Sequence, residues 1–271
     1  MSTTVRDTAL FGLVAVLLIG TGMIQGWNSA LLILNMGLIS AIMALGVNLQ
    51  WGFAGLFNIG VMGFVALGGL AAVLVSTDPV PEAWQAGGLR IFAGLALGAL
   101  TVVAAVQAQR RLAGRAKTIA TLVILVGGFF LYRAVFDPGK VAVEAVNPAV
   151  SGNLGGLNLP ILLSWPVGGL LAAGAAWVIG KTALGLRSDY LAIATLGIAE
   201  IIIAVLKNED WLARGVKNVI GLDRPVPYEI DLQNDPGFVE RAASFGLDPV
   251  TASTLYTKLG YAVLFTIVLL I

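Results

Sequence analysis

The stretch LFGLVAVLLIGTGMIQGWNSALLILNMGLISAIMALGVNL, residues 10–49, contains no charged side chain in forty consecutive positions. A helix needs about 20 apolar residues to cross the hydrocarbon core of a bilayer, so this stretch is long enough for two crossings joined near Trp27. Similar apolar stretches recur along the chain. The sequence therefore predicts about eight membrane spans, over residues 10–26, 31–49, 56–76, 91–108, 118–136, 161–179, 190–206 and from 259 onward.

The composition supports this interpretation and excludes most enzyme chemistry. Of 271 residues, 58% are hydrophobic and only 11% are charged, whereas soluble domains carry about 25% charged residues. The absence of His and Cys removes imidazole bases, thiol nucleophiles and the commonest metal ligands. We expect one all-α polytopic transmembrane domain over residues 1–271, with no catalytic residue, metal or cofactor. Nor does any run of Lys or Arg suggest nucleic-acid binding.

Charged residues in the loops predict the orientation of the chain. One side of the membrane collects Arg6, Arg110, Arg111, Arg115, Lys117, Lys181 and Arg187. Short loops on the other side carry Asp78, Glu82, Asp137 and Glu144, with only Arg90 and Lys140. Because Lys and Arg accumulate in cytoplasmic loops, we expect the N-terminus to be cytoplasmic.

A long polar segment, residues 208–257, follows the seventh predicted span and would lie outside the cytoplasm. It contains four prolines and many charges, and a loop of this length is usually functional or disordered. It is either a place where solute enters or a partner docks, or a solvated connector that could hold short helices. The last apolar stretch, from Tyr261 to Ile271, is too short to cross, so we expect the natural protein to continue and this chain to be its N-terminal portion.

The segment NLQWGFAGLFNIG, residues 48–60, interrupts the apolar pattern between the second and third predicted spans. It has three glycines and three amide side chains but no charge. Irregular backbone at membrane depth must line a cavity or be buried in protein, and interrupted helices bind solutes in transporters. The alternative is a tight cytoplasmic hairpin with capped helix ends. The predicted pathway residues here are Asn48, Gly52, Gly55, Asn58 and Gly60.

The segment SDYLAIATLGIAEIIIAVLKN, residues 188–208, holds the only acidic residue deep inside a predicted span, Glu200. A charge there costs at least ~2.5 kcal/mol. Helical spacing puts Glu200 on one face with Ala194, Gly197, Ala204 and Lys207, so we expect this face to turn toward neighbouring helices. The carboxyl group is either a polar contact on a solute pathway or an interhelical tie. Thr195 and Gly197 complete the predicted pathway residues.

Two further patterns predict packing and membrane position rather than chemistry. Gly94 and Gly98 form a GxxxG match, which predicts close helix packing. Four tryptophans lie near predicted outer boundaries, as interfacial anchors do: Trp27, Trp84, Trp165 and Trp211.

Two stretches of the sequence resemble the permease subunits of bacterial ABC importers for branched-chain amino acids. They are ALGVNLQWGFAGLFNIGVMGF, residues 44–64, and LGLRSDYLAIATLGIAEIIIAVLKNEDWL, residues 184–212. The second is similar to the larger, LivM-like type of subunit. The chain departs from the family at residues 214–218, RGVKN, where a glycine-rich turn is usual.

The resemblance implies an all-helical permease in the bacterial inner membrane that passes branched-chain amino acids or a related small solute. It implies a second, LivH-like permease subunit, two cytoplasmic ATPases and a periplasmic solute-binding protein as partners, besides membrane lipid. ATP hydrolysis would then belong to the ATPases, and no GxxxxGK[ST] phosphate loop occurs here. The alternative is a stand-alone channel or secondary transporter for a small polar solute such as urea or an amide.

Overall fold

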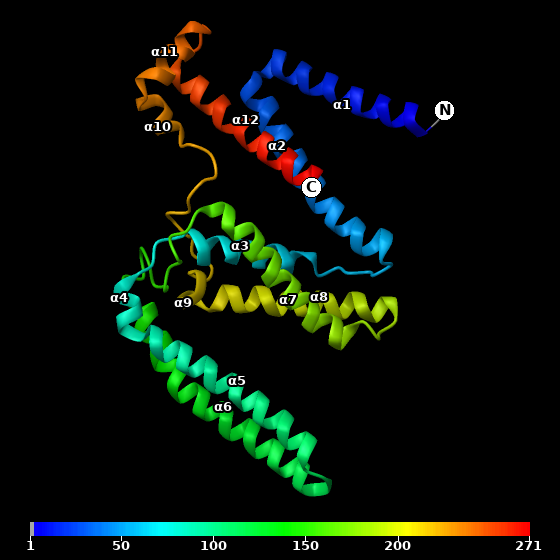
Figure 1. Cartoon of the computed structure of the whole chain (residues 1–271), viewed down its shortest axis with the longest axis vertical. Helices are drawn as coiled ribbons and strands as arrows, with labels where there is room; N and C mark the ends of the chain where they lie inside the picture. Colours follow the sequence, from blue (N-terminus) through cyan, green and yellow to red (C-terminus); the bar gives the residue numbers. More distant parts are fainter. Residues whose placement is uncertain (1–2) are drawn as a thin grey trace. The chain divides into compact units, whose positions relative to one another are not determined.

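The computed structural model describes residues 3–271 and is all-α, as the composition predicts (Figure 1). Its long helices are α1 (Thr3–Gln25), α2 (Trp27–Asn48), α5 (Leu89–Arg111), α6 (Gly114–Glu144), α7 (Ser164–Ala183), α8 (Ser188–Asn208) and α12 (Pro249–Leu270). Shorter helices are α3 (Val61–Ser76), α4 (Pro81–Ala83), α9 (Asp210–Ala213), α10 (Glu229–Asn234) and α11 (Pro236–Ser244). The remaining helical turns are the π-helical η1 (Leu49–Phe53) and η2 (Trp84–Gly88) and the 3-10 turn η3 (Ile161–Leu163).

Seven helical segments among the described residues are long and apolar enough to cross a bilayer, which confirms a polytopic all-α membrane protein. The third helix is shorter than the predicted span over residues 56–76. This helix, α3, begins only at Val61 and has 16 residues, because residues 54–60 are not helical. The interruption that the sequence indicates therefore shortens this helix from its N-terminal end.

The last span begins earlier than the sequence predicts. Helix α12 starts at Pro249 rather than near residue 259 and has 22 residues, so it is long enough to cross. The Asp248 carboxylate accepts hydrogen bonds from the amides of Val250 and Thr251 at 3.1 and 2.9 Å, and Pro249 suits the first helical position. Polar residues in its first turns conceal this helix start from a hydropathy pattern. The predicted segment 208–257 accordingly contains α9, α10, α11 and the first turns of α12.

The chain forms two compact units, each described by itself. The first consists of Met1–Asn58, Arg187–Ala192 and Arg224–Ile271, and the second of Ile59–Leu186 and Ile193–Asp223. In the first unit α2 packs against both α1 and α12. Asn35, buried in α2, donates a 2.9 Å hydrogen bond to the carbonyl of Lys258 in α12, and the Lys258 ammonium donates to the side-chain oxygen of Asn28. These polar contacts join the two spans.

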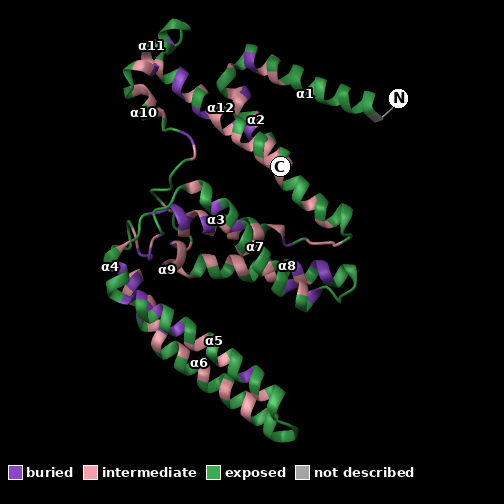
Figure 2. Ribbon diagram, in the orientation of Figure 1, coloured by how far each residue is buried: buried purple, intermediate pink, exposed green. Residues whose placement is uncertain are grey.

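In the second unit α5 and α6 form a long antiparallel hairpin (Figure 1). Buried residues lie where the two helices meet, and their outer sides are mostly exposed (Figure 2). A side chain at Gly94 would lie 2.7 Å from Cβ of Phe136, and one at Gly98 would contact the Tyr132 ring at 3.4 Å. The GxxxG match therefore packs against aromatic residues of α6, as predicted.

A buried apolar cluster holds the ends of this hairpin to the loop that follows it. The cluster contains Ala83, Ile91, Phe136, Val143, Leu154 and Trp211. The indole of Trp84 donates to the Leu154 carbonyl at 2.9 Å, and the Leu154 amide donates to the Trp211 carbonyl at 3.1 Å. Trp211 is thus a core residue with 7% exposure, and its prediction as an interfacial anchor is wrong.

Candidate functional site

The helix break predicted at residues 48–60 exists. Helix α2 continues into the widened π-helical turn η1, and residues 54–60 then run without helix to the start of α3. Gly55 adopts φ +65°, a left-handed conformation that favours glycine. The amides of Ala54 and Leu56 close the π-helical turn by donating to the carbonyls of Leu49 and Gln50 at 3.2 and 2.9 Å. The start of α3 has no side-chain cap. The helical structure is therefore interrupted between Phe53 and Val61, as predicted, and π-helical turns of this kind often mark functional sites. The choice between a solute-binding break and a tight hairpin stays a prediction.

A shallow groove of about 630 Å³ lies beside the π-helical turn in the first unit. It is lined by Ala44, Val47, Asn48, Trp51 and Gly52. The Asn48 side chain lies directly over Gly52, in the space that a Cβ there would occupy. The absence of a side chain at Gly52 thus makes room for the amide. Two predicted pathway residues meet here, on the side of α2 that Ala44 and Asn48 share.

A second amide contact lies just beyond the groove. The side-chain amide of Asn58 donates to the side-chain oxygen of Gln50 at 2.7 Å. This hydrogen bond joins the π-helical turn to the end of the irregular segment. A Cβ added at Gly55, which lies between them, would have no neighbouring atom within 4 Å, so the loop is open at its centre.

In the second unit the start of α3 packs directly on α8. The amide of Ile59 donates to the Thr195 hydroxyl at 3.3 Å. Gly60 lies against the Thr195 carbonyl so closely that no Cβ would fit, and a Cβ at Gly63 would lie 2.9 Å from Cα of Ala199. The structure therefore brings together Gly60 and Thr195, one residue from each of the two sequence segments singled out above.

The face of α8 that carries Glu200 is exposed. Thr195 and Ala199 are buried, whereas Gly197, Glu200 and Ala204 are exposed. Within the second unit α3 packs on the Thr195 side of α8 and not on this face, so the expectation that this face turns toward neighbouring helices stays a prediction. No hydrogen bond or ion pair joins Glu200 to another residue within 3–271. The carboxyl group of Glu200 thus lies on the exposed side of α8, midway along an apolar stretch.

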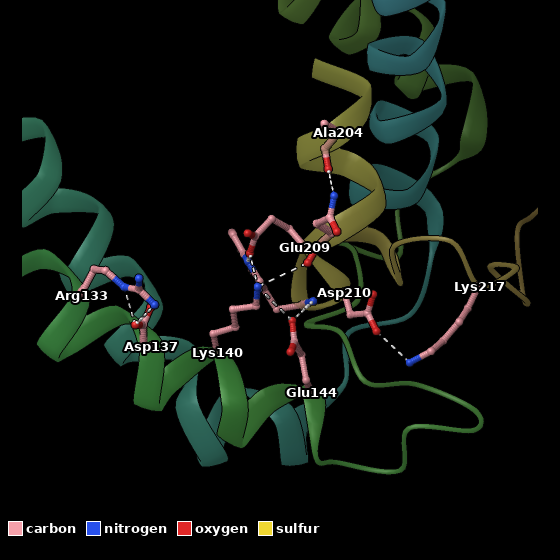
Figure 3. Close-up of polar contacts among 10 residues, drawn as sticks. Arg133, Asp137, Lys140, Glu144, Ala204, Glu209, Asp210 and Lys217 are labelled. Atoms are coloured by element: carbon pink, nitrogen blue, oxygen red, sulfur yellow. Dashed lines mark hydrogen bonds and ion pairs between the residues drawn. The ribbon is translucent and has the colours of Figure 1, made fainter. Parts of the chain in front are cut away.

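Sequence reasoning missed a polar cluster where α6, α8 and α9 meet (Figure 3). The Lys140 ammonium lies 3.0 Å from the carboxylate of Glu209 and 3.9 Å from that of Glu144. Glu144 accepts from the backbone amide of Trp211 at 3.3 Å, and Glu209 accepts from its indole at 2.7 Å. The spacing of Lys140 and Glu144, four residues apart in a helix, was the available signal. The cluster fixes the end of α8 against the hairpin.

A tight turn follows this cluster, at Arg214 and Gly215. Arg214 and Gly215 both have positive φ, at 63° and 58°. Arg214 is 6% exposed, and its guanidinium donates to the carbonyls of Asn218 and Ala149 at 2.6 and 2.8 Å. An arginine thus takes a conformation that glycine adopts more readily, because its side chain ties two loops together.

The fold and these interruptions define a class: a multi-pass membrane protein whose apolar helices are broken by an uncharged, glycine-rich and amide-rich segment. Residues 29–147 match the family described as branched-chain amino acid transport system / permease component. This stretch contains the π-helical turn and its groove.

Two curated relatives are similar to the chain. Both are called high-affinity branched-chain amino acid transport system permease protein LivM. The relative from Escherichia coli strain K12 is 33% identical over 93 residues, and the one from Salmonella typhimurium strain LT2 is 32% identical over the same length. The matches cover 34% of this chain and 21% of each relative, so the chain spans about a fifth of their length. No solved structure matches.

These matches confirm the resemblance to LivM-like permeases, a family of transport subunits. The second predicted match, residues 184–212, lies outside the stretch that the family profile covers, so it stays a prediction.

Proposed function

We propose that this chain is part of the membrane-spanning permease subunit of an ABC importer for branched-chain amino acids or a related small polar solute. The observation that carries the proposal is the family match over residues 29–147, which includes the interrupted helix and its groove. The subunit would lie in the bacterial inner membrane with its N-terminus in the cytoplasm. Its partners would be a second, LivH-like permease subunit, two cytoplasmic ATPases and a periplasmic binding protein.

The interrupted segment supplies the groups that a zwitterionic solute needs. A backbone without helix offers amide hydrogens to a carboxylate and carbonyl oxygens to an ammonium, at a depth where lipid offers neither. Asn48 adds a neutral amide beside the groove. We propose that Asn48, Gly52, Gly55, Asn58 and Gly60 form one part of the solute pathway, with Gly60 seated on Thr195.

The exposed face of α8 carries Glu200, the acidic side chain that could bind the ammonium group of the solute. A carboxylate facing lipid at the middle of a span costs at least ~2.5 kcal/mol, so Glu200 requires water, a cationic group or a partner helix beside it. We propose that Gly197 and Glu200 face the pathway in the assembled transporter. There Glu200 would attract the ammonium group of an amino acid, and the missing side chain at Gly197 would leave room for the solute.

The two compact units would together form one transmembrane domain, with residues 208–257 outside the cytoplasm. Helices α10 and α11 lie in this segment. A polar surface on the outer side is where a solute-binding protein would deliver its cargo. The chain itself would hydrolyse no ATP, because that reaction would belong to the partner ATPases.

Reconstitution distinguishes an importer subunit from a self-sufficient transporter. The permease would be placed in proteoliposomes with and without the ATPases, and radiolabelled leucine uptake measured with the binding protein outside. We expect uptake only with both ATPases and ATP. Uptake by the permease alone would instead support a channel or secondary transporter and overturn the proposal.

A further inference from the structure

An apolar groove of about 690 Å³ lies within the first unit, between α11 and adjoining parts of α2 and α12. Its volume is in the range of sites that bind small molecules. Apolar and aromatic side chains make up most of its lining, and Arg241 is the charged residue that lines it among those described. The walls include Trp27, Leu31, Phe238, Leu255, Tyr256 and Leu259.

The groove follows the side of two helices that are apolar enough to cross a membrane. Ala252, Leu255, Tyr256 and Leu259 line it from successive turns of α12, a length of about 10 Å at 1.5 Å per residue. In a bilayer crossed by these two helices, the groove would lie beside the lipid acyl chains.

The other end of the groove has the character of a membrane interface. Helix α11 is amphipathic: its residues Phe238 and Ala242 line the groove, while Glu240 and Ser244 are exposed. Phe245, directly after the helix, extends this apolar side. Phe245 is 81% exposed. A short helix with such a face lies in the plane of the interface with its apolar side toward the acyl chains. Trp27 and Tyr256 beside it are residue types that gather at that level.

Arg241 stands at this end with free hydrogen-bond donors. Its contact with the Asp235 carboxylate is long, at 3.8 Å, and both side chains are mostly exposed. The Asp235 carboxylate also accepts a hydrogen bond from the backbone amide of Gly237 at 3.0 Å. A guanidinium presents donors in a planar fork that matches a phosphate.

We propose that this groove is a binding site for an anionic phospholipid, with an acyl chain along α12 and the phosphate at Arg241. The groove is apolar along its length and has one cationic side chain, Arg241, at the end that resembles a membrane interface. A phospholipid with an apolar acyl chain and a negatively charged head group matches this arrangement. The proposal goes beyond transport and does not depend on it, because it rests only on the groove and its charge.

Photo-crosslinking tests the proposal on the full chain in vesicles of phosphatidylcholine. A diazirine-bearing phosphatidylglycerol or phosphatidylcholine probe would be added at equal mole fractions, and adducts mapped by peptide mass spectrometry. We expect phosphatidylglycerol to label the groove residues of α11 and α12 more than phosphatidylcholine does. The Arg241→Gln variant should lose about fivefold of this labelling, the effect of removing one basic group near an anionic lipid.

Two further variants make the result specific. Leu259→Trp, at a side chain that is 53% exposed, should obstruct the groove and reduce labelling by both probes. Arg110→Gln, which removes an exposed arginine outside the groove, should leave the labelling by both probes unchanged.

Three results would overturn the site. One is equal labelling by the two lipids, and another is labelling no stronger than at Ile267, elsewhere on α12. The third is loss of labelling when the complete transporter is assembled, which would mean that a protein partner covers the groove. Leucine uptake in the same variants reports on transport separately.

Discussion

At Gly60 a single hydrogen atom takes the place where any other side chain would meet the Thr195 carbonyl. The backbone itself would accept alanine, since φ is −78°. We therefore expect Gly60→Ala to destabilise the protein by about 1–3 kcal/mol through overpacking. Unfolding in mixed detergent micelles would measure the loss. Gly69→Ala, within α3 at a position where an added Cβ would have no atom within 4 Å, is the control, and an equal effect of both changes would argue against a close α3–α8 contact.

Glu200 combines exposure, a formal charge and an apolar helix, so its role can be tested by removing the charge alone. We expect Glu200→Gln to fold normally and to lower the initial rate of leucine uptake about tenfold or more. This corresponds to losing one hydrogen bond to a charged group, about 1.5–3 kcal/mol. Glu82→Gln, at an exposed acid in the short helix α4, should transport as the unchanged chain does. Unchanged uptake by Glu200→Gln would show that the pathway does not need this charge.

On the scale of helices, the α5–α6 hairpin depends on glycine at its contact. Leucine at position 94 would force Phe136 away, because even a Cβ would lie 2.7 Å from Cβ of Phe136. We expect Gly94→Leu to lower the free energy of unfolding by about 1–3 kcal/mol. Gly127→Leu in α6 places the same side chain at an open position and should have little effect. Similar midpoints for the two variants in a denaturing detergent titration would contradict the hairpin packing.

The start of α12 should respond to acid. Hydrogen bonds from the hydroxyl and amide of Thr251, with the amide of Val250, lower the pKa of Asp248 below its ordinary value. A lowered folded-state pKa means that the cap stabilises the helix above the unfolded pKa, about 3.9, and is lost as pH falls through the folded value. Hydrogen exchange at Val250 and Thr251, corrected for intrinsic rates, should therefore accelerate below about pH 4. The Asp248→Asn variant keeps a cap that does not titrate, so an acid response there would exclude Asp248 as its source.

The sequence predicted the helices that are uniformly apolar, because length and hydropathy alone define a span. It also predicted the break before α3, since glycines and amides replace apolar residues there. The sequence did not predict which side chains and helix faces are buried, because contacts between distant segments determine this. Trp211 is buried by Phe136 and Leu154 from distant segments, and the packed face of α8 is set by the two glycines of α3. Helical periodicity could place Thr195 and Glu200 on different faces but not say which one is covered.

For the whole molecule, the decisive prediction concerns which side of the membrane each segment faces. Residues 1–271 contain no cysteine, so single-cysteine variants of this chain need no background removal. Ala113 lies between α5 and α6 within the basic segment, and Val216 is an exposed residue of the polar segment 208–257. We expect a membrane-impermeant maleimide to label Val216→Cys in spheroplasts and Ala113→Cys only after permeabilisation, because Lys and Arg accumulate in cytoplasmic loops. Labelling of Ala113→Cys from outside would reverse the orientation, and with it the side on which a binding protein could dock.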